Sequence, residues 1–263
     1  MSNDRNAKTW AFGVEPGRLP YRLRQARYQA LGEDVGRLAR EHFDRTRRAL
    51  ELIDVGTDEG VARRYIEAQP GGERVRYHGV DLFPEGMRNV YKRHDWKLTQ
   101  IDLEGGMPGI APDRYDVVIC EQVLEHLHHC EEALGELVRV LRPGGMLIVG
   151  VPIFPHGIHA LRQPLVNTLA ALKLRTNSPH GHVQAFSKRS FLRLLEGTGE
   201  LEIQEVRGFR IISGGPLRGL EYCRWWWLLN RRIGRIVPSL CVEIQVVARK
   251  KLRAAEVAVR AAA

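Results

Sequence analysis

The sequence is poor in the features that mark secreted, membrane-spanning and metal-clustered proteins. Its four cysteines, Cys120, Cys130, Cys223 and Cys241, show no CxxC spacing, so we expect reduced thiols and no disulfide framework. No stretch approaches the ~20 apolar residues of a membrane-spanning helix. The polar N-terminus also lacks the apolar segment of a secretory signal. These absences predict a cytoplasmic protein.

The composition predicts one large core with decorations. The chain has 263 residues, of which 44% are hydrophobic, and this is enough for a single sizeable domain. Its net charge of +9 comes from 40 Lys and Arg against 31 Asp and Glu. That charge fits a solvated arginine-rich surface, or attraction to anionic partners such as nucleic acid or phospholipid. Nucleic acid is the less favoured partner, because no basic run is interleaved with aromatic residues.

Strand-like and helix-like segments alternate along most of the chain, which predicts a doubly wound α/β sheet. The expected strands are Leu50–Val55, Val75–Asp81, Trp96–Asp102, Tyr115–Cys120, Met146–Val151, and two half-buried ones, Leu201–Phe209 and Cys241–Ala248. The expected helices are Tyr21–Arg48, Val61–Ala68, Glu131–Leu141, stopped by Pro143-Gly144-Gly145, and one that Ser187 caps.

This alternation divides the chain into three parts. Residues 1–48 are predicted to form a helical N-terminal extension, residues 49–250 the main domain, and residues 251–263 a tail. Two inserts, 152–186 and 211–239, interrupt the regular pattern. Long connections in an α/β domain usually serve as lids or binding elements, so we expect both inserts on the substrate side.

Acidic residues end three of the predicted strands. The first strand runs into Asp54-Val-Gly-Thr-Asp-Glu-Gly60, where a glycine turn lets the backbone approach a ligand. The second ends in Asp81, about 20 residues later, where a carboxylate can accept bonds from both ribose hydroxyls. The third ends in Asp102, which is placed to accept from an adenine amino group. Three carboxylates would repel a pyrophosphate, so the set favours S-adenosylmethionine (SAM) over a dinucleotide. The alternative is that they only cap helices.

Six motifs occur in the order typical of one family, and with them the chain resembles the class I SAM-dependent methyltransferases, closest to the type 11 group. They are DVGTDEG, VDLF, QIDLEGGMP, YDVVICEQVLEHL, LRPGGMLIVGVP and HVQAFSKRSFLRLLEGTG. The resemblance covers about residues 49–250. It implies a Rossmann-like, seven-stranded sheet of order 3-2-1-4-5-7-6, with the last strand antiparallel and helices on both faces.

The resemblance also implies a set of site residues. SAM, which yields S-adenosylhomocysteine as product, would be held by Asp54, Gly56, Thr57, Asp58, Gly60, Asp81, Leu82, Asp102, Leu103 and Glu121. The family usually has glycine where this chain has Asp58, which leaves the affinity for SAM open. The turn after the fourth strand faces the methyl group in the family, so Glu125 and His126, with His182 from the insert, are the predicted catalytic residues.

The acceptor is less well determined. After the fourth strand there is neither an Asn/Asp-Pro-Pro-aromatic tetrapeptide nor a Pro-Cys, which argues against methylation of a nucleic-acid base. An oxygen or an acidic carbon is therefore the expected acceptor, and we favour O-methylation of a sugar, lipid-linked or small-molecule hydroxyl. Two alternatives remain: a non-catalytic SAM-binding sensor or partner subunit, and an RNA 2′-O-methyltransferase.

A metal site is a weaker hypothesis. The turn Gln122-Val-Leu-Glu125-His126 is similar to the Glu-x-x-Glu-His of metal-dependent methyltransferases, and His182 could add a ligand to a divalent ion. A neutral amide replaces the first glutamate here, and an amide is a poorer ligand for a hard cation. The sequence therefore favours catalysis without a metal.

The segment 217–237 combines three adjacent tryptophans with five arginines. As a helix it would gather Tyr222, Trp225, Trp226, Leu229, Ile233 and Ile236 on one face. That face could pack on the core or against the mate in a homodimer. It could also lie in the plane of a membrane, with tryptophans at the headgroups and arginines on anionic lipid, which would place the enzyme peripherally at the inner face of the membrane.

Overall fold

A seven-stranded sheet of order β3-β2-β1-β4-β5-β7-β6 organises the computed structural model, which describes residues 25–58, 60–82, 97–153, 183–211, 220 and 223–253. The strands are β1 (Leu50–Val55), β2 (Val75–Asp81), β3 (Lys97–Gln100), β4 (Tyr115–Glu121), β5 (Leu141–Pro152), β6 (Leu201–Phe209) and β7 (Glu243–Lys250). Strands β1 to β5 pair in parallel, whereas β7 runs antiparallel to both of its neighbours. The predicted fold is confirmed.

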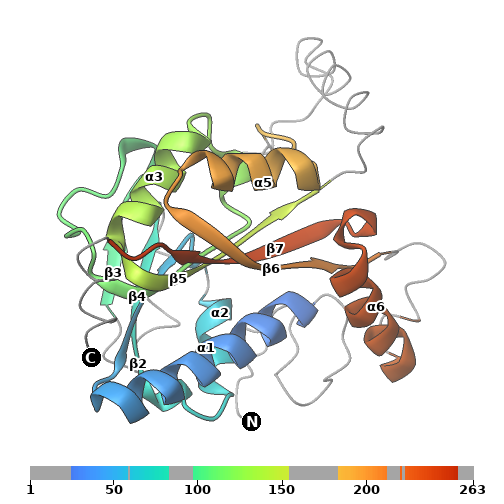
Figure 1. The fold of residues 1–263 in the computed structure, drawn as a ribbon, viewed down its shortest axis with the longest axis horizontal. Helices are drawn as coiled ribbons and strands as arrows, with labels where there is room; N and C mark the ends of the chain where they lie inside the picture. Colours follow the sequence, from blue (N-terminus) through green and yellow to red (C-terminus); the bar gives the residue numbers. More distant parts are fainter. Residues whose placement is uncertain are drawn as a thin grey trace, which may run out of the picture.

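Helices cover both faces of this sheet (Figure 1). One face carries α1 (Ala26–Thr46) and α2 (Val61–Glu67), and the opposite face carries α3 (Cys130–Val140) and α5 (Lys188–Gly197). Short 3-10 turns connect the elements: η4 (Gly72–Arg74), η5 (Leu103–Gly105), η6 (Leu124–His126) and η8 (Pro238–Leu240). The larger core lies under α3 and α5, and the smaller one lies between α1, α2 and the opposite face of the sheet, from β2 across to β7.

The N-terminal helix packs directly on the domain. Its apolar positions recur with helical spacing, and Leu31, Val35 and Ala39 are fully buried in the smaller core. The helix ends at Arg47, which adopts a left-handed conformation and donates its amide to the carbonyl of Phe43. The helix that the sequence predicts as an extension therefore shares a core with β1 and α2.

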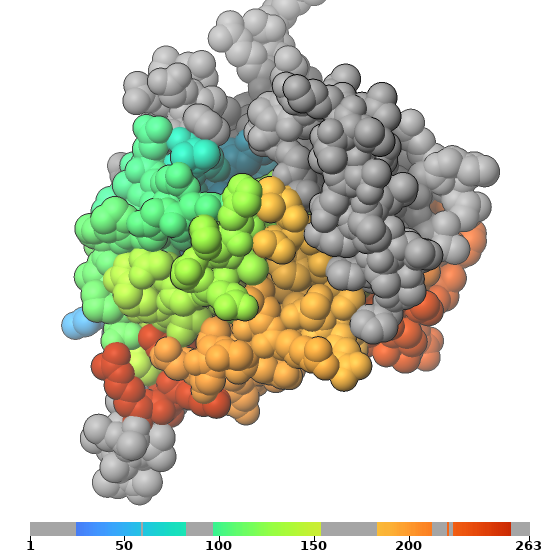
Figure 2. All heavy atoms as spheres, turned by 90° about the horizontal axis from the view of Figure 1, so that it is seen from above, coloured from blue at the N-terminus to red at the C-terminus, as the bar shows by residue number. Residues whose placement is uncertain are grey.

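The predicted cap of α5 is confirmed. The Ser187 side chain accepts from the amide of Ser190, and the Ser190 hydroxyl accepts from the amide of Ser187 in return. This reciprocal pair fixes the first turn, so that Phe191 and Leu195 face the larger core. From above, the residues of α5 (golden) lie beside those of α3 (yellow-green) in Figure 2. The chain therefore closes one face of the sheet with two neighbouring helices.

Two sequence predictions need correction. The fifth strand begins at Leu141, not Met146, because Leu141 already pairs with Tyr115 and an irregularity accommodates the Pro-Gly-Gly segment. Strand β7 is buried along almost its whole length rather than half-buried, because both of its faces pack in a core, with Val246 in the larger one and Val247 in the smaller one. Its polar residues are therefore buried as well.

A further finding concerns α6 (Arg224–Ile236), which lies beside β6 in Figure 1. The sequence leaves its apolar face open between packing on the core or a dimer mate and lying in the plane of a membrane. In the structure, Asn230 and Gly234 are the buried residues of this helix, while Trp225 and Ile236 are exposed. No helix in the described ranges has the length and apolarity needed to cross a bilayer.

Candidate active site

The order of the strands reverses between β1 and β4, and this reversal fixes where a ligand can bind. From β1 the chain continues outward to β2 and β3, whereas β4 and β5 lie on the other side of β1. In open α/β sheets, the loops at such a switch point diverge and leave a crevice at the carboxyl ends of the strands. The loop after β1 and the turn after β4 flank this point, and they carry most of the predicted site residues.

The loop after β1 turns tightly against the turn after β4. Gly56 has a φ of +76°, and a Cβ added there would lie 2.1 Å from Cγ2 of Val123. Only glycine fits a left-handed residue with so little space. The amides of Gly56 and Thr57 donate to the carbonyl of Val80, and Gly60 caps α2 in the left-handed conformation. The backbone is thus fixed before any ligand binds.

The Asp54 side chain is held by the hydroxyl groups of Tyr77 and Thr57. Its side chain is buried, with 3% of the residue exposed, and it accepts a hydrogen bond from the Tyr77 hydroxyl. Thr57 Oγ1 lies 2.6 Å from the same hydroxyl oxygen. Burial raises the pKa of the Asp54 carboxyl to about 6, although the hydrogen bonds from Tyr77 and Thr57 oppose the shift. Asp54 therefore stabilises the loop in addition to any contact with a ligand.

The predicted ribose and adenine positions lie at the ends of β2 and β3. One oxygen of Asp81 accepts from the amide of Asp58, at 2.9 Å, so the end of β2 is tied to the loop after β1. Leu82 is an exposed apolar residue beside it. Asp102 caps η5 by accepting from the amide of Glu104, and Leu103 is buried behind it. The capping role, left open by the sequence, thus applies to one oxygen of Asp102.

The turn after β4 brings the predicted catalytic pair together. His126 is about one third exposed, with 32% of its side chain accessible, whereas the Glu125 side chain is 1% exposed. Oε1 of Glu125 lies 3.9 Å from Nε2 of His126, and Oε2 has no hydrogen-bond partner among the described residues. Burial raises the pKa of the Glu125 carboxyl to about 8. The third predicted residue, His182, lies outside the described residues.

Main-chain atoms at the ends of the insert 152–186 contact the turn after β4 and the end of β5. The amides of Val183 and Gln184 both donate to the carbonyl of Glu125, and Ile153 pairs with Phe186. The described residues at both ends of the insert therefore lie against this part of the sheet. This geometry places the ends of the insert beside the turn that carries His126.

Glu121 belongs to a buried ionic network. Its Oε1 accepts from Nε2 of Gln245 at 2.7 Å, across the glycine of β5 that lies between them in register. Its Oε2 lies 3.7 Å from Nε of Arg27, whose Nη1 is 3.2 Å from Glu243. Burial raises the pKa of the Glu121 carboxyl to about 7, while Arg27 and Gln245 lower it. The expected contact of Glu121 with the cofactor gains no support from this position.

The described residues fit SAM better than a dinucleotide. Asp54, Asp58 and Asp81 place three carboxylates at the ends of β1 and β2, and the exposed Leu82 offers an apolar surface for a base. A sulfonium and an ammonium are attracted by this charge, whereas a pyrophosphate is repelled. Among the described residues, no three His, Cys, Asp or Glu side chains gather as metal ligands would. The metal hypothesis therefore has no supporting geometry in those ranges.

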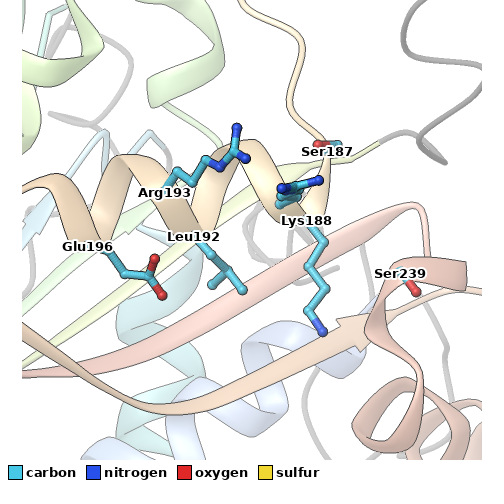
Figure 3. Close-up of a pocket in the computed structure, with 7 residues that line it drawn as sticks. Ser187, Lys188, Leu192, Arg193, Glu196 and Ser239 are labelled. Carbon is cyan, nitrogen blue, oxygen red and sulfur yellow. The ribbon is translucent and has the colours of Figure 1, made fainter.

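A separate surface pocket of about 510 Å³ lies on α5 and η8 (Figure 3). Lys188, Leu192 and Glu196 project toward the same side of α5, and Ser239 lines the pocket from η8. None of the predicted site residues lines it. The pocket is thus distinct from the switch point.

Comparison with known proteins identifies the family. The family described as "Methyltransferase domain" matches residues 22–205, which is more than half of the chain and includes α1. The chain belongs to the SAM-dependent methyltransferases of class I. Members of this family are methyltransferases that use SAM as cofactor, and the chain spans just under two thirds of the length of the first relative described below.

Three similar proteins illustrate the range of the family. The ubiquinone biosynthesis O-methyltransferase of Rickettsia akari is 24% identical over 168 residues, which span 64% of this chain and 64% of the relative. The YcgJ protein of Bacillus subtilis matches with a TM-score of 0.54 and 16% identity, covering 85% of this chain and 98% of that one. The Burkholderia thailandensis 1,6-didemethyltoxoflavin-N1-methyltransferase was crystallised with S-adenosylhomocysteine. It matches with a TM-score of 0.52 and 15% identity, covering 85% of this chain and 79% of that one.

Two residues important for the methyltransferase site were missed in the sequence. Tyr77 supports Asp54, and Val123 closes on Gly56. The first could have been found from strand register, because Tyr77 pairs with Leu52, two residues before Asp54, and therefore lies on the same face. The second contact joins two loops, and no periodicity predicts it.

Proposed function

We propose that this methyltransferase transfers a methyl group to the oxygen of a hydroxyl on a sugar, a lipid-linked molecule or another small molecule. The observation that carries the proposal is the juxtaposition, at one switch point, of a preformed glycine loop with the Glu125–His126 turn. The first element suits a cationic cofactor. The second offers a base beside it.

In this proposal each residue has a physical role. The cofactor supplies an electrophilic methyl group on a sulfonium centre. The loop after β1 and Asp81 bind and orient it, and correct alignment accounts for much of the acceleration in such a displacement. The partly exposed His126 accepts the proton of the acceptor hydroxyl. The buried Glu125 carboxyl, with Oε1 3.9 Å from Nε2 of His126, is the acidic neighbour of this base.

The acceptor atom is a matter of proposal because the fold hosts several chemistries. One relative is named an O-methyltransferase, and one structural neighbour is named an N1-methyltransferase. Fold similarity at these identities does not select between oxygen and nitrogen. The absence of base-methylation motifs after β4 and the Glu125–His126 pair both support oxygen. A lipid-linked acceptor would also require contact with a membrane surface.

The alternative function is SAM binding without catalysis. Asp58, which stands where the family usually has glycine, adopts a φ of +45° and ties its amide to Asp81. A loop that contains a strained Asp58 bonded to Asp81 could hold SAM without catalysis, as in a sensor or partner subunit. Methylation of RNA at the 2′ oxygen would in addition require binding that weakens steeply with salt.

The direct test is incubation with methyl-labelled SAM and a panel of sugars, quinones, lipids and RNA. Label transferred to a hydroxyl compound supports the proposal, and label found only on nitrogen or carbon contradicts it. The matched variants are His126→Ala and His128→Ala, because His128 is an exposed neighbour that pairs with Glu104. We expect His126→Ala to lower turnover at least tenfold, with unchanged affinity for S-adenosylhomocysteine, and His128→Ala to retain activity.

A further inference from the structure

Helix α6 presents an unusual surface. Nine large hydrophobic residues are exposed among those that the structure describes, and seven of them lie in α6 and directly after it. They are Trp225, Leu228, Leu229, Ile236, Val237, Leu240 and Val242. Trp225 is 57% exposed and Ile236 is 70% exposed. A concentration of this kind on one element marks an interaction surface, because scattered single residues are the normal case.

The way α6 docks on β6 explains why this face is left outside. A Cβ added at Gly234 would lie 2.1 Å from the carbonyl oxygen of Gly208, so the helix and the strand meet backbone to backbone. Oδ1 of Asn230 accepts from the amide of Ile211, and its Nδ2 donates to the carbonyl of Trp226. A backbone contact and a polar side chain therefore help to hold the helix, and its exposed apolar residues lie outside that attachment.

The exposed residues form one stripe along the helix. Trp225, Leu228, Leu229 and Ile236, together with Arg232, fall within about 100° of arc at helical periodicity. The other arginines lie on the flank of that stripe: Arg224, Arg231 and Arg235. Arg231 pairs with Glu33 and stacks on Trp227, and Arg235 is 3.8 Å from Glu205. The helix itself contains no acidic residue.

We propose that the outward face of α6 and η8 docks on an anionic lipid surface, lying in its plane. Exposed tryptophan and leucine side chains suit the boundary between headgroups and acyl chains, and arginines suit anionic headgroups. A helix of 13 residues is only about 20 Å long, which matches a helix lying flat. The proposal is independent of the methyl acceptor.

The charge pattern favours a lipid surface over a second copy of the chain. In a twofold-symmetric contact the same patch meets itself, so Arg232 would approach its own counterpart with no acid on the helix to neutralise it. Like charges brought together at an interface cost energy. An anionic bilayer attracts every arginine on this helix at once.

Flotation with vesicles of phosphatidylglycerol and phosphatidylcholine tests this directly. The wild-type chain should float with these vesicles at low salt, and much less with phosphatidylcholine alone. Arg232→Glu with Arg235→Glu should lower the bound fraction at least about tenfold, since each basic residue contributes about 1 kcal/mol at such a surface. The control Arg45→Glu with Arg48→Glu makes the same charge change at exposed residues around the far end of α1 and should bind as wild type.

A second variant separates the apolar contribution from charge. Trp225→Ser with Leu229→Ser removes two exposed side chains, so folding should be retained by circular dichroism while flotation falls. A wild-type chain that stays at the bottom of the gradient overturns the proposal, as does an equal loss in the α1 control. A dimer in sedimentation velocity that Trp225→Ser dissolves would assign the face to a second copy and also overturn it.

Discussion

The carboxylates on the two halves of the sheet have different surroundings, although all stand at the same edge. At the ends of β1 and β2, Asp54 and Asp81 accept bonds from neutral hydroxyl and amide groups. At the end of β4 and the start of β7, Glu121 and Glu243 are buried beside Arg27 of α1 and Arg210, which directly follows β6. The first pair is left with net negative charge, and the second is largely neutralised.

This difference teaches that an acid at a strand end is not sufficient to mark a ligand site. A carboxylate held by neutral donors still attracts a cation, so Asp81 and its neighbours can serve a cationic cofactor. A carboxylate paired with guanidinium groups in the interior mainly fixes the elements that supply them, and removing one partner leaves a buried charge. The carboxylates at β1 and β2 therefore bind the cofactor in this account, and those at β4 and β7 hold α1 against β7.

The largest expected effect on stability is at the cofactor half. Gly56→Ala places a Cβ against Val123 at a left-handed residue, so we expect a loss of about 2–5 kcal/mol in the free energy of unfolding, with weaker binding of S-adenosylhomocysteine. Urea unfolding measures this loss. The control Gly135→Ala adds a methyl group in α3, with no atom within 4 Å, and should be neutral or slightly stabilising. Equal stability of both variants would show that the loop is not preformed.

At the other half, a smaller effect is expected where α6 meets β6. Gly234→Ala brings a Cβ against the carbonyl of Gly208, so the helix must move outward at a cost of about 1–3 kcal/mol. Gly197→Ala at the end of α5 meets open space and serves as the matched control. Thermal unfolding with tryptophan fluorescence follows both. Binding of S-adenosylhomocysteine should be unaffected, and a large loss of affinity in Gly234→Ala would remove the distinction between the halves.

The smallest expected effect is a change in the pH dependence of stability. A buried acid with a raised pKa binds its proton more tightly in the folded chain. Its stabilising contribution is therefore complete below the ordinary pKa near 4.5 and is lost as the pH rises through about 8. Glu125→Gln, which cannot ionise, should lose less stability between pH 5 and 8 than wild type, by about 1 kcal/mol or more.

Denaturation at several pH values checks this, with the exposed Glu196→Gln as control. Parallel pH profiles for wild type and Glu125→Gln would mean that Glu125 is solvated, and that His126 lacks the buried neighbour assigned to it.

Much of the fold could be predicted because the periodic spacing of apolar residues and the capping residues are local features of the sequence. The alternation of strands and helices, the Ser187 cap and the sheet order were all confirmed. The failures share one cause, which is that neighbours distant in sequence decide burial. Strand β7 alternates polar and apolar residues, yet it is buried because both of its faces are covered, Val246 in the larger core and Val247 in the smaller one. Helix α6 docks by Asn230 and Gly234, which no hydrophobic pattern selects.

The candidate site was predictable in position more than in detail. Asp54, Gly56 and Asp81 could be located because glycine turns and strand ends are local features of the sequence. The partners of Glu121 could not, because Arg27 and Gln245 lie 94 or more residues away from it in the chain. Long-range ion pairs of this kind carry no local signal.

Paired calorimetry of S-adenosylhomocysteine binding tests the contrast between the two halves most directly. Asp81→Ala should weaken binding well over tenfold, because it removes two hydrogen bonds to a charged carboxylate, which together contribute about 2–4 kcal/mol. Glu121→Gln, which keeps a side chain of the same shape within the network, should bind within about twofold of wild type even though it unfolds more easily. The account is contradicted if Asp81→Ala binds as wild type, or if Glu121→Gln loses as much affinity as Asp81→Ala.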